Sequence, residues 1–308
     1  MKISQVINLY KNFGFEITLS SVFASMFRSA SDWRHRDIMK YLKENYKDFI
    51  SEYQNKKYPG EHHNSKIIWT LWWQGDSEKI LPPTVKLCFD RMKRNCGSHE
   101  LKILTKDNYH EYVKMPKYIL DKVNSGQITL THFSDLIRMY LLLNHGGLWL
   151  DATIFTAGKI PEEIFDLEYF TIRRVFDTHQ RNISKGRWTS FLHAAKSNTA
   201  LCDFVYNFFL EYWKHEKILI HYHLIDYTIA TAFEEISECN RLMNSVPLNN
   251  PEMGLLDDLM SKKFDEALYK QLTENTIFFK LAWRTDYKKS IADHETFYGH
   301  LLKEANLN

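Results

Sequence analysis

Apolar residues recur along the chain with two different spacings, which predict helices and strands. Helical spacing appears within residues 15–27 and 38–53, so the N-terminal region is expected to hold two amphipathic helices. Short, mostly apolar runs predict strands at 66–75, 101–104, 168–176 and 275–283. Helical patterns follow at 82–92, 200–213, 224–236 and 290–305. Strands that alternate with helices favour an α/β fold with a wound, mostly parallel sheet.

The stretch HFSDLIRMYLLLNHGGLWLDATIF, residues 132–155, changes from helical spacing to a strand pattern at two glycines. Thr129 or Thr131 can cap the helix, and Gly146 or Gly147 supplies its left-handed stop. The run LWLDATIF that follows is apolar on both faces, which is typical of a central strand.

A carboxylate, Asp151, lies inside that apolar strand. Burying it is costly unless a partner neutralises it. In the preceding helix Asp135 and Arg138 are three residues apart and share a face, although such a pair alone is more often a surface ion contact. Ligands of open α/β sheets bind beyond the carboxyl ends of strands, so these three residues are expected to meet in one crevice. Such a crevice suits a ligand with hydroxyls and phosphates, with or without a divalent metal.

Composition narrows the class of protein. The chain has 308 residues, of which 44% are hydrophobic, so it can bury a large core. A net charge of only +2 argues against a general nucleic-acid binder. The four cysteines form no CxxC pair, which favours reduced thiols in a cytoplasmic protein. No apolar run approaches the length of a membrane span, and we expect no secretory signal.

Several stretches together resemble bacterial capsular polysaccharide synthesis proteins. More broadly they resemble retaining GT-A glycosyltransferases, the group of the yeast mannosyltransferase-like enzymes and the glucosylating clostridial toxins. The stretches are KIIWTLWWQG, TKDNYHEYV, HFSDLIRMYLLLNHGGLWLDAT and FKLAW. The similarity is strong over about residues 66–155 and weak elsewhere. It implies a Rossmann-like GT-A domain over 61–308, with a mixed, mostly parallel sheet and helical additions at both ends, and a helical extension over 1–60.

The resemblance also implies roles for single residues. Trp69 and Trp72 would enclose the nucleotide base, with one of the two expected in the core. Asp135 and Arg138 would hold the donor sugar, and Asp151 would match the first acid of the DxD motif. The full set implied in nucleotide-sugar binding is Trp69, Trp72, Ser134, Asp135, Arg138, Gly147, Trp149, Asp151 and Trp283. The set expected to be catalytic is Asp135, Arg138, Asp151 and Asp226, the last on the acceptor side.

The sequence departs from the motif at its second acid, which is Thr153. A hydroxyl is a poorer ligand than a carboxylate for Mn²⁺ or Mg²⁺. Either a divalent metal is held by the diphosphate, Asp151 and a residue from elsewhere, with Thr153 at the ligand position, or cationic side chains replace it. Trp283 with Arg284, Lys288 and Lys289 could form a lid over the diphosphate; the alternative is a solvated helix start.

These features predict a transferase that moves a hexose from a UDP-sugar to a polysaccharide or lipid-linked oligosaccharide acceptor, with retention. We expect it in the cytoplasm, with the N-terminal helices either packed on their own domain or touching the inner face of the plasma membrane. Two alternatives stay open. One is a non-catalytic module that binds sugar nucleotides or glycans, which Thr153 favours, and the other is a protein-modifying glucosyltransferase. The histidines at 62–63 and 221–223 lack a third ligand at a recognisable spacing, so a metal role is not expected.

Overall fold

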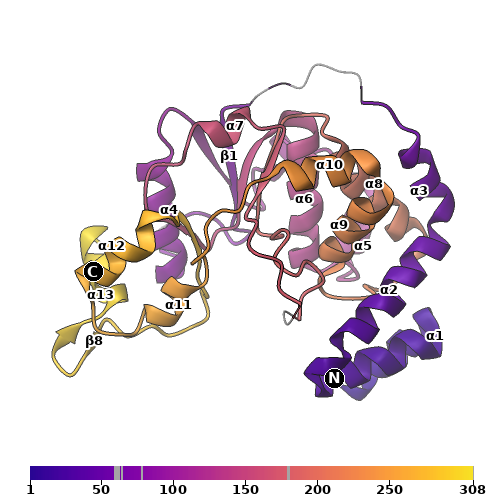
Figure 1. The fold of residues 1–308 in the computed structure, drawn as a ribbon, viewed down its shortest axis with the longest axis horizontal. Coiled ribbons are helices and arrows are strands. Elements are labelled where there is room, and N and C mark those ends of the chain that lie inside the picture. Colours follow the sequence, from indigo (N-terminus) through magenta and orange to yellow (C-terminus); the bar gives the residue numbers. More distant parts are fainter. Residues whose placement is uncertain (59–62, 64, 78, 179–180, 308) are drawn as a thin grey trace.

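The computed structural model describes residues 1–58, 63, 65–77, 79–178 and 181–307. A central sheet lies between two groups of helices (Figure 1). The N-terminal helices and the C-terminal helices lie at opposite ends of the molecule (Figure 1). The expected helical additions are therefore present, and they leave the sheet between them.

The central sheet has five strands in the order β2-β1-β3-β6-β5. Their bounds are Ile67–Leu71 for β1, Glu100–Leu104 for β2, Gly147–Leu150 for β3, Tyr169–Thr171 for β5 and Leu192–Ala195 for β6. β1 is parallel to both β2 and β3, whereas β6 is antiparallel to β3 and β5. Four of the five strands thus share one direction. The predicted α/β fold with a mixed, mostly parallel central sheet is confirmed.

Helices α6 and α4 flank this sheet. α6, Leu130–His145, begins at Thr129, whose side chain accepts a hydrogen bond from the backbone N–H of His132. It ends at Gly146, whose φ of 69° lies in the left-handed region that glycine favours. The other helices of this region are α4 (Pro83–Asn95), α5 (Lys117–Asn124), α7 (Glu163–Asp166), α8 (Ala200–His215), α9 (Leu224–Glu235) and α10 (Ser237–Ser245).

The run LWLDATIF does not form one strand, so that prediction is wrong. β3 ends at Leu150, the chain turns, and β4 (Ile154–Thr156) pairs antiparallel with β7 (Phe278–Lys280) in a separate small sheet. The turn is closed by a hydrogen bond from the N–H of Ile154 to the carbonyl of Asp151. The apolar pattern could not show this break, because both pieces are buried. Its consequence is that the late segment, residues 278–283, runs alongside the segment that carries Asp151.

The C-terminal part also differs from expectation. The closing helix is α13, Phe297–Glu304, and the first part of the predicted helix forms a hairpin of β8 (Ser290–Ile291) and β9 (His294–Glu295). α11 (Leu255–Leu259), α12 (Glu266–Glu274) and α13 share a second apolar cluster with residues of α4 and β4. The C-terminal part therefore packs against α4 and against the small sheet of β4 and β7.

The N-terminal region holds α1 (Ile3–Met26), interrupted at Gly14, followed by α2 (Ser31–Asn45) and α3 (Lys47–Gln54). The predicted helices are confirmed. α2 packs on α9, where His35 contacts Tyr227. The predicted boundary at residues 60–61 lies outside the described residues, so the division into a helical extension and a second domain stays a prediction. None of the helices in the described part of the chain is long and apolar enough to cross a membrane.

Candidate functional site

Asp151, at the carboxyl end of β3, is held by partners from three parts of the chain. Its Oδ1 accepts hydrogen bonds from Nη2 of Arg138 at 2.9 Å and from Nε1 of Trp149 at 3.0 Å. Its Oδ2 is 2.8 Å from Nζ of Lys280. The expected meeting of Arg138 with Asp151 is confirmed. The carboxylate side chain is still 27% exposed, so a ligand can reach it.

Opposing effects set the charge of this carboxylate. Burial raises the pKa of Asp151, but the positive charges of Lys280 and Arg138 outweigh it and hold that pKa below its ordinary value. Asp151 is therefore ionised at neutral pH. A carboxylate of this kind can accept hydrogen bonds from sugar hydroxyls or accompany a cation that faces phosphate.

Arg138 is fixed between two acids of different elements. One guanidinium nitrogen bonds Asp151, and the other is 3.3 Å from Oδ1 of Asp135 on the same helix face. The guanidinium also lies 5.0 Å from the ring centre of Trp149. Among the described residues, Nε of Arg138 is buried without a hydrogen-bond partner. The guanidinium is thus rigidly placed and keeps one donor for a further group.

Lys280 is a site residue that the sequence reasoning missed. It lies 129 residues after Asp151, on β7, and reaches the carboxylate because β7 pairs with β4. The motif FKLAW contains it, but only Trp283 was given a role there. The signal was the position of a lysine in a buried strand, where a charge needs a partner. The site thus has two cations on one acid.

Trp72 and Trp283 form the aromatic part of the site. Their rings meet edge to face, with centroids 5.3 Å apart. Trp72 directly follows β1 and Asp151 directly follows β3, and these are parallel neighbours, so both residues lie at the same sheet edge. Trp283 is three residues after Lys280. Nε1 of Trp72 is buried without a partner among the residues that the structure describes, which leaves a donor for a ligand.

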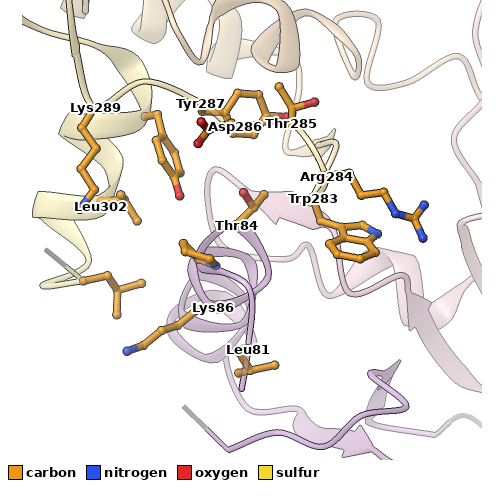
Figure 2. Close-up of a pocket in the computed structure, with 13 residues that line it drawn as sticks. Leu81, Thr84, Lys86, Trp283, Arg284, Thr285, Asp286, Tyr287, Lys289 and Leu302 are labelled. Atoms are coloured by element: carbon orange, nitrogen blue, oxygen red, sulfur yellow. The ribbon is translucent and has the colours of Figure 1, made fainter. Parts of the chain in front are cut away.

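A pocket of about 590 Å³ lies beside Trp283. Trp283 and Arg284 form one side, Lys289 lies on the opposite side, and Thr84 and Lys86 of α4 lie between them (Figure 2). The Arg284 guanidinium is 4.4 Å from the ring centre of Trp283. The cationic lining suits phosphate. Because Asp151 is not among the lining residues, a lid over the diphosphate stays a prediction.

A second acid, Asp226, lies in the first turn of α9. Its Oδ1 accepts a hydrogen bond from Nε1 of Trp188 at 3.0 Å, and its Oδ2 is 3.7 Å from Nδ1 of His223. Burial raises the pKa of Asp226 to about 6, against the lowering effect of His223 and Trp188. The electrostatic influence of Asp135 and Arg138 also reaches Asp226. Two acids with oppositely shifted pKa values thus flank the Asp135–Arg138 pair, as in many catalytic sites.

Comparison with protein families adds one decisive finding. A family described as capsular polysaccharide synthesis protein matches residues 22–301. The chain belongs to this family. The solved structures include one titled PaToxG Glycosyltransferase, at 13% identity and a TM-score of 0.35, covering 78% of this chain and 94% of that one. That likeness is too low to support an inference about ligands. A search of curated proteins found no match.

Some roles implied for this capsular polysaccharide synthesis protein do not agree with its structure. Trp69 is fully buried and its Nε1 donates to the carbonyl of Gly146 at 2.9 Å, so it belongs to the core and not to a base pocket. Gly147, with φ of 100°, is needed because a Cβ there would lie 2.4 Å from the carbonyl oxygen of Ile67. The close packing on β1 is thus sufficient to explain this glycine, and its role in ligand binding stays a prediction. Trp149 is buried and acts by holding Asp151 and Arg138.

Whether the site can hold a divalent metal depends on the side chains that could coordinate it. Among the described residues, no group of three or more His, Cys, Asp or Glu side chains could hold a metal ion. Both Asp151 oxygens are engaged by cations, and Thr153, which is buried, offers a hydroxyl in place of the second acid. Mn²⁺ and Mg²⁺ favour several hard oxygen ligands. The residues present therefore do not fit a dedicated divalent site.

Ser134, which was predicted to bind the nucleotide sugar, is half-buried on α6, next to Asp135 in the sequence.

Proposed function

We propose that this capsular polysaccharide synthesis protein is a glycosyltransferase that moves a hexose from a nucleoside diphosphate sugar, in our proposal UDP-linked, to a glycan acceptor. The observation that supports this most is the Asp151 carboxylate at an open strand end, held by Arg138 and Lys280. A partly buried cluster of one acid and two cations contributes little to stability compared with an apolar core, so its presence favours a ligand.

The chemistry follows from the bond that breaks. The bond between the anomeric carbon and the leaving diphosphate gives up its electron pair to oxygen, and negative charge grows on the diphosphate. Lys280, 32% exposed, can contact that charge directly, whereas Arg138, 5% exposed, would stabilise it from beneath Asp151. Asp135 and Asp151 would accept hydrogen bonds from the sugar and ribose hydroxyls. Trp72 would contact the base.

Asp226 is proposed to orient the acceptor. Its environment keeps the pKa near the working range of a group that accepts a proton or a strong hydrogen bond. In a front-face transfer with retention, the acceptor oxygen forms the new bond to the anomeric carbon, and its proton goes to an oxygen of the leaving diphosphate. Proton NMR of the product tests this stereochemistry, because an inverted anomeric signal would exclude retention.

For the metal, the donor set favours the second of the two arrangements that the sequence left open. We expect Lys280, with Arg138, to supply the positive charge for which enzymes with a complete DxD motif use a divalent ion. Transfer should then persist in EDTA, and added Mn²⁺ should raise it less than threefold. If EDTA abolished the wild-type reaction and Mn²⁺ restored it, a metal would be required.

A non-catalytic nucleotide-sugar module is the second candidate, and Thr153 is the observation that favours it. Incubation with radiolabelled UDP-sugars separates the two. A transferase slowly hydrolyses its donor without acceptor and transfers sugar with one, whereas a binding module does neither. Label that appears on a polypeptide instead of a glycan would support a protein-modifying glucosyltransferase.

Peripheral membrane contact is a further part of the proposal. α1 exposes apolar side chains along much of its length, among them Ile3, Ile7, Phe15, Phe23 and Met26, and Phe27 directly after it is exposed too. Such a face can insert at the boundary between headgroups and acyl chains. Sedimentation with anionic vesicles tests it: the protein should pellet with them, and Phe15→Glu together with Phe23→Glu should leave it in the supernatant.

A further inference from the structure

A small pocket beside Asp226 carries more positive than negative groups. Its volume is about 310 Å³, at the lower end of the range for small-molecule sites. The ionisable residues in its lining are Arg34, His35, Arg181, His221, His223, Asp226 and Tyr227. They come from α2, α9 and the segments before α9, so the pocket lies where the N-terminal helices meet the central domain. Asp226 is the one carboxylate among its lining residues, and it is already bonded to Trp188.

The polar groups of this pocket leave donors directed at no protein acceptor. Nε of Arg34 is buried and has no hydrogen-bond partner among the described residues. Nδ1 of His221 accepts from the backbone N–H of His223 at 3.1 Å, so its other ring nitrogen carries the proton of the neutral ring. His35 is different: it lies between the hydroxyl of Tyr227 and the carbonyl of Arg181, at 2.7 and 2.8 Å. His35 is satisfied, whereas Arg34 and His221 keep donors for a ligand.

The electrostatics agree with an anion site. Burial, and then the positive charges of Arg34, His223 and His35, lower the pKa of His221 to about 3. The lining holds two arginines, Arg34 and Arg181, against one carboxylate, so the pocket carries a net positive charge. An anion in the pocket would be attracted by that charge.

A second pocket continues from the first. It has a volume of about 350 Å³ and shares Arg34 and His221 with the pocket beside Asp226. Its remaining lining comes from α1 and from residues 218–220, and includes Leu9, Leu219 and Ile220. The outer side of α1 carries the exposed apolar residues described above. The two pockets therefore lead from a buried acid, past cations, to α1, which lines the second pocket with Gln5, Asn8, Leu9, Ser21 and Ser25.

We propose that Arg34, Arg181 and His221 bind the phosphate or diphosphate ester of the acceptor, so that the acceptor saccharide lies at Asp226 and the group esterified to its phosphate extends along α1. Arginine suits this role because its forked donors match phosphate oxygens. The inference rests on the proposed glycosyltransferase function, since Asp226 is its acceptor side. It adds that the acceptor carries phosphate, either on a lipid or as a soluble sugar phosphate.

The test compares two ligands on two variants of the full chain. Farnesyl diphosphate serves as the acceptor-site probe and UDP as the donor-site probe, both measured by isothermal titration calorimetry. Arg34→Gln should weaken farnesyl diphosphate about tenfold or more and leave UDP unchanged, because a charged hydrogen bond to phosphate is lost. Lys280→Gln should weaken UDP and leave farnesyl diphosphate unchanged.

Controls separate binding from folding. Lys40→Gln removes an exposed cation from the same helix, outside this pocket's lining, and should change neither affinity. Arg181 is exposed, so Arg181→Gln leaves the core intact and should still weaken farnesyl diphosphate about threefold or more. Thermal unfolding of each variant verifies the fold.

The outcomes distinguish this inference from the proposed function. If Lys280→Gln lost farnesyl diphosphate binding while Arg34→Gln and Arg181→Gln kept it, both ligands would bind at Asp151 and the proposed phosphate site would be wrong. It would also be wrong if the wild type did not bind farnesyl diphosphate at all. Failure of UDP to bind would instead contradict the proposed function. A hexose 1-phosphate separates the two sources: equal affinity indicates a soluble acceptor, whereas tighter binding of farnesyl diphosphate than of both hexose 1-phosphate and inorganic pyrophosphate indicates a lipid-linked one.

Discussion

The two ends of the site use the same kinds of residue in opposite ways. At Asp151, each carboxylate oxygen meets a cation, and Asp135, the second acid beside Arg138, balances the second positive charge. At Asp226, the neighbouring cations Arg34 and Arg181 contact the carboxylate in none of the described ion pairs, and the acid itself is bonded by a neutral indole. One end is therefore arranged around a fixed ionised acid, and the other around an acid that protonates easily beside unmatched positive charge.

The two acids are both aspartates, so their different pKa values come from their surroundings and not from the residue type. The pKa of Asp151 is lowered because two cations outweigh its burial, whereas the pKa of Asp226 is raised because burial outweighs its weaker partners. A fixed anion with paired cations suits the donor diphosphate and its sugar. A weakly held acid suits an acceptor hydroxyl, which it can orient by a hydrogen bond.

The largest effect should come from Asp151→Asn. Removing the ionised group leaves Arg138 and Lys280 without their counter-charge and should lower kcat/KM on the order of 1000-fold. The native carboxylate contributes stability above its ordinary pKa of 3.8, which is lost as the pH falls through its lower folded value. The variant should therefore unfold at a lower temperature at neutral pH. Asp121→Asn, on an exposed face of α5, is the matched control and should change neither quantity.

Asp226→Asn should separate stability from activity. Because the folded pKa of about 6 exceeds the ordinary 3.8, the folded state binds the proton more tightly. Stability should fall as the pH rises from about 4 to about 6, and the loss is complete above that range. The neutral amide, which can still accept from Trp188, should stabilise the protein at neutral pH by about 1–3 kcal/mol. Transfer should fall about 100-fold with donor hydrolysis retained; equal loss of both would place Asp226 at the donor.

Lys280→Gln should have a smaller effect that reveals its partner. We expect kcat/KM to fall roughly tenfold to 100-fold, since Arg138 still compensates part of the charge. The pKa of Asp151 should rise when this cation is removed, so the acid limb of the pH–rate profile should move to higher pH. A profile that does not move would mean that Lys280 and Asp151 do not interact in the working enzyme.

The smallest effect concerns the two tryptophans of the first strand region. Trp72→Ala should raise the KM for the UDP-sugar about tenfold, because contact with a base is lost. Trp69→Phe should leave KM unchanged and lower only the thermal stability, because it removes a buried hydrogen bond to Gly146. The reverse result would place the base at Trp69.

The sequence predicted four of the five strands of the central sheet, most helices and the meeting of Arg138 with Asp151, because periodicity, glycine stops and ion-pair needs are local or nearly local signals. It missed the turn after Asp151 and the strand β6, whose four residues are buried and too few to show a period. It also missed Lys280 and the pocket beside Asp226, because both are formed by segments far apart in the chain. Lys280 reaches Asp151 because β7 pairs with β4, and Arg34 reaches the pocket because α2 packs on α9.

The central claim is that Asp151, Arg138 and Lys280 together hold a nucleotide-linked sugar. Calorimetric titration of the wild type and of Lys280→Gln with a panel of UDP-sugars tests it most directly. At least one UDP-sugar should bind the wild type saturably and bind Lys280→Gln about tenfold more weakly. If every UDP-sugar bound both proteins equally, or bound neither, the cluster would not be a donor site.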